Sequence, residues 1–247
     1  MVLHSFFLCT LLTISLSFHG ITALRQLSDS LPKSAGPTKA RHVEYQVINV
    51  VPTTPGGISF DNKIGIPFTK EIMRTSNNFI WSVVFQQNDP SDQKPVDLII
   101  LYIAEFEGPT GIQWGTNINV SSLYVKGLEG DVKWQFTGLM YHEMTHVFQW
   151  DGEGTAPLML IEGIADYALL ISSYAPSQFP KKGEGDKWDE GYGITARFLE
   201  YCDGITPSFV AKLNKMMRVK YDVKYFEKLT GKPVDQLWKE YKAKYGH

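Results

Sequence analysis

Cysteine is scarce in this sequence: Cys9 and Cys202 are the two present among 247 residues. Cys9 lies in an apolar amino-terminal stretch that we expect to be removed on export, which would leave Cys202 alone. A single cysteine cannot form an intramolecular disulfide, so a fold held by disulfides is excluded. A chain of about 200 residues can instead bury a large core. We expect Cys202 in that core as a small apolar side chain rather than as a nucleophile.

Strong net charge is also absent. The 24 Lys and Arg residues nearly balance the 26 Asp and Glu residues, which gives a formal charge of −2. This balance provides no electrostatic basis for binding nucleic acid or an anionic membrane. Internal repeats, low-complexity tracts and long linkers are missing as well. We therefore expect one domain, present as a monomer.

Long hydrophobic runs are missing too. Residues 6–16 are apolar but fall short of the about 20 residues that span a membrane, and Ile21-Thr22-Ala23 is an acceptable cleavage site. We expect a secretory signal at residues 1–23 and hence a soluble, extracellular mature protein. Residues 24–40 contain Ser, Pro and Lys with little apolar content, which predicts a flexible leader or a short propeptide before a folded domain at 41–247.

Strand-like patterns occupy the first half of the expected domain. Residues 43–50 alternate in part, residues 96–103 indicate a buried strand, and residues 114–125 indicate a strand pair or an edge strand. Pro55-Gly56-Gly57 predicts a break after the first strand, and residues 68–85 have helical periodicity. We expect that helix to bury Ile72, Phe79, Ile80 and Val83.

Helical patterns fill the second half. Strands first and helices later predict an α+β fold, with an amino-terminal mixed sheet and a helical carboxy-terminal half. The helices are expected at residues 132–150, 157–173, 192–201, 207–217 and 234–244.

The expected helix at 132–150 carries the sequence His142-Glu143-Met144-Thr145-His146. Residues four apart lie on one helix face, so His142 and His146 can direct two imidazole nitrogens at one point. Zinc accepts such nitrogens at about 2.0–2.1 Å and keeps a water, which Glu143 can reach as a general base. The alternative is a helical histidine pair with a solvent-facing Glu143. The apolar residues on either side of the motif disfavour that alternative.

A catalytic zinc usually has three protein ligands. Glu162 is a candidate because it is a lone acid in an apolar helical run that begins at Pro157. Its rivals Asp151 and Glu153 lie in a glycine-rich connector, where acids are usually solvated turn residues. Asp166, one turn after Glu162, is expected to accept the far ring N–H of a ligand histidine. An ordinary acid on the helix surface is the alternative reading of Asp166.

Two further positions are candidates outside this cluster. Tyr192 can donate its phenol hydrogen to a tetrahedral oxyanion, although it can equally cap the core beside a helix end. In the same segment, Arg197 is expected to pair with Asp189 rather than to bind a substrate carboxylate. Asn119 begins an Asn-Val-Ser acceptor for N-glycosylation, which export would make usable and which otherwise stays unmodified.

Several stretches together resemble the plant basic secretory protein family, over nearly the whole mature chain. The resemblance implies a zinc peptidase secreted to the apoplast and associated with plant defence. It also implies one zinc per chain, bound by His142, His146 and Glu162, with Glu143 as the catalytic residue. The stretches are Thr54–Gly57, Phe85–Asn88, Tyr141–Trp150, Glu162–Tyr167, Trp188–Cys202 and Val234–Tyr245.

The block from His142 to Tyr167 is more distantly similar to gluzincin peptidases. In those enzymes a Glu on the following helix completes the site, and an acid four residues later supports a ligand histidine. The chain departs in two respects from the basic secretory protein family that it resembles. It is slightly acidic where the family name says basic, and Gly193 stands where members commonly carry Asp.

These features predict hydrolysis of a peptide or protein substrate by a zinc-activated water, with Glu143 carrying the proton to the leaving amine. By analogy, an extended substrate could add to the edge strand expected at 114–125. Two other functions stay open. The chain could be a non-catalytic, defence-related binding protein that retains a structural zinc site, or it could be a metal hydrolase acting on substrates other than peptides.

Overall fold

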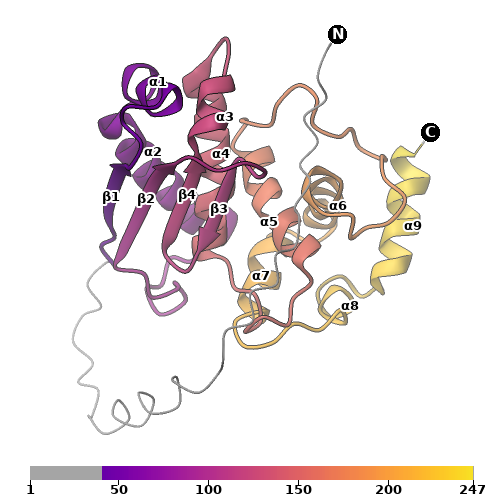
Figure 1. The fold of residues 1–247 in the computed structure, drawn as a ribbon. Coiled ribbons are helices and arrows are strands. Elements are labelled where there is room, and N and C mark those ends of the chain that lie inside the picture. The colour runs from indigo at the N-terminus through magenta and orange to yellow at the C-terminus, as the bar shows by residue number, and fades with distance from the viewer. Residues whose placement is uncertain (1–40, 247) are drawn as a thin grey trace, which may run out of the picture.

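The computed structural model describes residues 41–246 (Figure 1). The predicted signal at 1–23 and leader at 24–40 lie outside the described residues and stay predictions. In the part that the structure describes, strands come first and helices later, so the predicted α+β class is confirmed.

Four strands in the described part of the chain form one sheet. The parallel strands are β1 (Glu44–Asn49), β2 (Leu98–Ala104) and β4 (Asn117–Ser121), and β3 (Gly111–Trp114) pairs with β4 in the antiparallel sense. The spatial order is β1-β2-β4-β3, which makes the sheet mixed, as predicted, and puts β3 at an edge. The β3–β4 hairpin turns over two residues, and Gly115 there has a φ of 61°, which glycine adopts without strain.

Helices connect the parallel strands β1 and β2. They are α1 (Pro55–Lys63) and α2 (Ile66–Phe79), and α2 continues into a π-helical turn, η1 (Ile80–Val84). Parallel neighbours need such a crossover, because the first strand ends at one edge of the sheet and the next begins at the opposite edge. In Figure 1 these helices lie on one side of the sheet, so its other side faces away from them.

The break expected at Pro55-Gly56-Gly57 is the first turn of α1. The Thr54 hydroxyl caps this helix by accepting a hydrogen bond from the Gly57 amide at 3.2 Å, and proline suits a first turn. The glycines allow close packing. A Cβ on Gly56 would collide with the backbone of Ser122, and one on Gly57 with the backbone of Val51. The pattern therefore reflects contact with other segments rather than a chain break.

The buried face of the helix predicted at 68–85 differs from the prediction at one position. Ile80 is fully buried, and Ile72 and Phe79 pack against the core with part of their surface exposed. The prediction for Val83 was wrong, since 47% of this residue is exposed. A π-helical turn holds more residues than an α-helical turn, which moves the inward face to Val84.

Every helix predicted from residue 132 onward is present, with its ends shifted by a few residues. Besides α1, two six-residue helices were not predicted, because six residues carry too little periodicity to identify. The first of them, at residues 122–127, corrects the strand expected up to residue 125, since the strand pair ends at Ser121. The helices are α3 (Ser122–Gly127), α4 (Val132–Phe148), α5 (Leu158–Ile171), α6 (Tyr192–Ile205), α7 (Phe209–Met216), α8 (Tyr225–Thr230) and α9 (Val234–Tyr245), of which α3 and α8 are the unpredicted pair.

The helix α4 links the two halves of the fold, since it contacts α2 and β3 on one side and α5 on the other (Figure 1). The Asp131 carboxylate starts it by accepting a hydrogen bond from the Trp134 amide at 2.9 Å. Most of its side chains are buried, so its polar residues near the carboxyl end require partners inside the protein. Cys202 in α6 is buried and free, as expected. Among residues 41–246, no helix combines the length and the apolar character needed to cross a membrane.

Candidate metal centre

The last two turns of α4 bring His142 and His146 together. Their rings lie 4.7 Å apart between centroids and are nearly perpendicular, at 85°. Their Nε2 atoms are 3.0 Å apart, so both nitrogens face the same small volume. Spacing by four residues on a regular helix produces this convergence, as the sequence predicted.

The following helix, α5, adds a carboxylate to the pair. The Glu162 Oε2 atom lies 3.2 Å from His142 Nε2 and 3.5 Å from His146 Nε2. The rival acids Asp151 and Glu153 are exposed and do not join the cluster. They occupy a connector between α4 and α5 in which Glu153 itself has a positive φ of 54°. The connector turns the chain so that α5 packs beside α4.

The geometry fits a zinc ion. Ligands about 2.0–2.1 Å from a tetrahedral zinc lie about 3.3 Å from one another, and the three distances here are 3.0, 3.2 and 3.5 Å. Two imidazole nitrogens and one carboxylate oxygen are also a common donor set for catalytic zinc. Bringing a carboxylate and two histidines into a largely buried space is costly unless they are paired or bind a cation. The residues present therefore suit zinc in both distance and donor type.

Asp166 lies behind His142, on the side away from the cluster. Its Oδ1 atom is 2.7 Å from His142 Nδ1, and the residue is buried. A carboxylate can only accept here, so Nδ1 carries the hydrogen and the Nε2 lone pair is left for the metal. The structure thus places Asp166 where a supporting role for a ligand histidine requires it.

Gln149 takes the corresponding place behind His146, and the sequence analysis missed it. Its side-chain amide lies 2.6 Å from His146 Nδ1, with Nε2 as the nearer atom. Its Oε1 atom is buried and has no hydrogen-bond partner among the described residues. The backbone oxygen of Gln149 accepts from Lys94 Nζ at 3.1 Å, which fixes the residue at the end of α4. The available signal was its spacing of three from His146, on the same helix face.

The orientation of the Gln149 amide is coupled to the tautomer of His146. When the amide N–H points at Nδ1, that nitrogen must be an acceptor and Nε2 carries the hydrogen. A metal on Nε2 requires the opposite arrangement, with Nδ1–H donating to Oε1. A half-turn of the amide exchanges the two atoms and yields the metal-binding tautomer.

Glu143 is almost fully buried and lies against the edge strand. A Cβ added to Gly111 in β3 would collide with the Glu143 carboxylate, at 2.7 Å from its carboxyl carbon. Glycine at this position therefore lets the backbone of β3 run directly beside the carboxylate. This contact joins the expected base to the one strand of the described sheet that is antiparallel.

Burial and neighbouring charges shift the pKa of each group in the cluster in opposite directions. Burial raises the pKa of Glu143 above its ordinary 4.5, and the nearby histidines only partly offset this effect. Burial lowers the pKa of His142, but the carboxylates of Asp166 and Glu162 outweigh it and hold this pKa well above 6.5. The two histidines likewise hold the pKa of Glu162 far below its usual range, against the effect of burial. Without a cation, a proton on His142 balances the carboxylates, so a metal would displace that proton.

Tyr192 reaches the cluster from the start of α6. Its ring stacks on the His142 imidazole, with 6.2 Å between centroids and 9° between planes. Its φ of 44° is unusual for a residue with a side chain, and it follows Gly191, whose φ is 90°. An added Cβ on Gly191 would lie 2.6 Å from Met159 Sδ, so this entry to α6 is closely packed. The oxyanion role of Tyr192 stays a prediction.

The predicted pairing of Arg197 with Asp189 was wrong. Arg197 instead pairs with Glu200 at 3.0 Å, one turn along α6, and donates to the Pro180 carbonyl at 2.8 Å. Asp189 lies 3.8 Å from Lys187. A partner three residues away on the same helix is available without any loop having to fold back, which the sequence argument overlooked.

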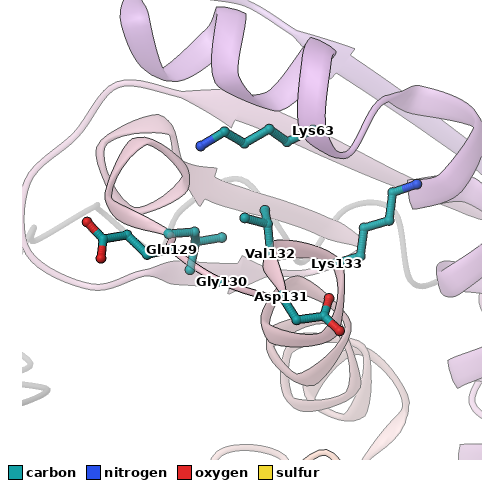
Figure 2. Close-up of a pocket in the computed structure, with 7 residues that line it drawn as sticks. Lys63, Glu129, Gly130, Asp131, Val132 and Lys133 are labelled. Atoms are coloured by element: carbon teal, nitrogen blue, oxygen red, sulfur yellow. The ribbon is translucent and has the colours of Figure 1, made fainter.

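A surface hollow of about 560 Å³ lies at the other end of α4, where the helix begins (Figure 2). Lys63 and Lys133 border it together with the acids Glu129 and Asp131. None of the predicted site residues lines this hollow. The candidate site is therefore the cluster at the carboxyl end of α4 rather than this cavity.

Comparison with known proteins supplies a family for the chain. The chain matches the family described as "Peptidase of plants and bacteria" over residues 40–241. It is also similar to a protein of Boswellia serrata named "Basic secretory protease", with 43% identity over 60 residues. That region is 24% of this chain and 69% of the relative. No solved structure is significantly similar to the chain.

Proposed function

Because the chain belongs to the family of peptidases of plants and bacteria, we propose that it is a secreted, zinc-dependent peptidase. One observation carries the zinc dependence. His142, His146 and Glu162 place three ligand atoms within 4.8 Å of one another. These residues would bind one zinc per chain. Glu143, buried beside them, would be the catalytic base.

The metal and the side chains would contribute different parts of the reaction. Zinc held by these residues would supply a water of pKa about 7 and a Lewis acid for the scissile carbonyl. Glu143 would take the proton of that water and pass it to the leaving amine. Its raised pKa favours the first of these transfers, because a carboxylate with a higher proton affinity accepts the proton more readily. Tyr192 is proposed to donate to the oxyanion from the face of His142.

The edge strand β3 is proposed to hold the substrate. In the described sheet β3 pairs on one side with β4, so its other side can pair with an extended peptide. The backbone of β3 passes the Glu143 carboxylate at Gly111. A peptide added to this edge would therefore run past the catalytic base.

Secretion and a role in plant defence complete the proposal. The apolar run at residues 6–16 and the cleavage site at 21–23 support export. The name of the Boswellia protein calls that relative secretory. An apoplastic location and a monomeric state are part of the same proposal.

The alternative function is a defence-related binding protein that retains zinc for stability. Catalysis and binding are separated by measuring zinc content together with cleavage of a generic protein substrate, before and after a chelator. The proposal expects stoichiometric zinc, cleavage that stops on chelation, and recovery when zinc is returned. Stoichiometric zinc without any cleavage would favour the binding protein. Panels of ester and amide substrates test the third possibility, hydrolysis of substrates other than peptides.

A further inference from the structure

The side of the sheet that faces away from the helices carries two rows of side chains. Strand register defines them, because residues directly opposite one another point to the same face. The buried face holds the partners Val47, Leu101 and Ile118. The open face therefore holds the row Ile48, Tyr102, Asn119 and Ile112, and the row Gln46, Ile100, Asn117 and Trp114.

This open face is apolar for a surface that no described element covers. Trp114 is 79% exposed, Ile112 is 44% exposed and Ile48 is 39% exposed. Tyr102 lies between them with part of its surface exposed. Contiguous exposed apolar side chains of this kind usually mark a surface that something else covers.

Asn119 lies at the centre of the face. Tyr102 is its direct neighbour on β2 and Ile112 its direct neighbour on β3. Trp114 is its diagonal neighbour, about 7–8 Å away, within reach of a large side chain. The Asn119 amide has no hydrogen-bond partner among residues 41–246, so the fold itself gives no reason for asparagine here.

We propose that Asn119 carries an N-linked glycan that lies over this face and covers Tyr102, Ile112 and Trp114. Asn119-Val120-Ser121 is an N-glycosylation acceptor, and the partly exposed amide points away from the core. The proposal rests on secretion, since only an exported chain meets the modifying enzymes. It does not depend on the metal or on catalysis.

The chemistry of the face favours a carbohydrate over a protein partner. A protein docked here would strip water from two asparagine amides, Asn117 and Asn119, which costs free energy unless each amide is paired again. A sugar chain presents hydroxyl groups that can bond the Asn117 amide. Its flat apolar faces can also pack on the rings of Tyr102 and Trp114. Attachment at the centre places it over both rows.

The site is tested with the full chain produced in secreting plant cells. Enzymatic removal of N-glycans should reduce the mass of the secreted wild-type protein but not of Asn119→Gln. Asn117→Gln is the matched control, because it changes the same residue type on the same face and leaves the acceptor intact. Ser121→Thr should also keep the glycan. Ser121→Ala is unsuitable, since the Ser121 hydroxyl donates to the Phe106 carbonyl and caps α3.

The outcomes of this first test are distinct. A glycan that is lost in Asn119→Gln and kept in Asn117→Gln supports the site. Secreted wild-type protein without a glycan overturns the proposal while leaving secretion intact. A chain that remains inside the cell without a glycan overturns secretion, and this proposal with it.

Coverage is tested by hydroxyl-radical oxidation read at single residues by mass spectrometry. Removing the glycan, or using Asn119→Gln, should raise the oxidation of Trp114 severalfold. Trp134 on α4 serves as an internal reference and should not change, and Ser121→Thr, which keeps the acceptor, should match the wild type. Equal oxidation of Trp114 with and without the glycan would overturn the claim that the carbohydrate lies on this face.

Discussion

The two histidines of the cluster share one helix face but are held in different ways. Asp166 holds His142 from α5, through a carboxylate that can only accept a hydrogen bond. Gln149 holds His146 from the end of α4, through an amide that can either donate or accept. The first arrangement always keeps a hydrogen on Nδ1 of His142, as metal binding at Nε2 requires, whereas the second does so for His146 only in one orientation of the amide. The contrast implies that the protein prepares His142 for metal and that His146 adapts when metal arrives.

The largest expected effect comes from the ligand that the two histidines share. Glu162→Ala removes the only carboxylate donor in the described cluster, so zinc affinity should fall by more than the about 10–100-fold typical of outer partners. Peptidase activity should disappear with it. Zinc stoichiometry after dialysis against a weak chelator measures the loss. Asp151→Ala and Glu153→Ala are matched controls that should keep zinc, and the assignment is wrong if either of them loses it while Glu162→Ala does not.

On the side of His142, Asp166→Asn keeps the shape of the side chain but replaces a carboxylate by an amide. Zinc affinity should fall by about 10–100-fold, because the fixed acceptor for Nδ1–H is lost. The affinity is measured by competition with a chelator of known strength. An affinity equal to that of the wild type would show that the carboxylate is not needed to orient His142.

A smaller effect is expected on the side of His146. Gln149→Leu removes the acceptor, and zinc affinity should fall toward the lower end of the about 10–100-fold range. Gln149→Glu offers a fixed carboxylate and should restore or exceed the wild-type affinity, which a purely structural role would not produce. Equal losses in both variants would contradict a hydrogen-bonding role for this residue.

The pH dependence of activity should separate the proposed base, Glu143, from the proposed metal ligand, His142. Burial raises the pKa of Glu143, so activity in excess zinc should fall as the pH decreases and the base becomes protonated. With limiting zinc, protons also compete for His142, whose pKa its carboxylate neighbours raise above 6.5 despite burial, so the loss should begin at a higher pH. Activity profiles at two zinc concentrations test this. Coincident profiles would mean that proton competition at His142 does not limit metal binding.

The sequence predicts the parts of the site that depend on local spacing. His142 and His146 follow from the helical repeat, and Glu162 follows from its isolation in an apolar helix. Gln149 escaped notice because a glutamine at a helix end looks like any polar residue unless its orientation is known. The contact between Gly111 and Glu143 joins segments far apart in the chain, which periodicity cannot reveal.

The fold shows the same difference between features that a single segment determines and features that depend on contacts with distant segments. The α+β class and the longer helices come from patterns within single segments. Pro55-Gly56-Gly57 has the composition of a turn, yet tertiary packing places it in a helix. Arg197 has two acids within reach along the chain, and only the helix geometry selects Glu200 over Asp189.

Glu143→Gln tests the central claim most directly, because it removes the proposed base and leaves His142, His146 and Glu162 unchanged. Zinc content and cleavage of a protein substrate are measured on the same purified sample. The account predicts one zinc per chain, as in the wild type, and activity reduced by about 10²–10⁴-fold. Cleavage at the wild-type rate by a zinc-loaded Glu143→Gln protein would contradict the proposed mechanism.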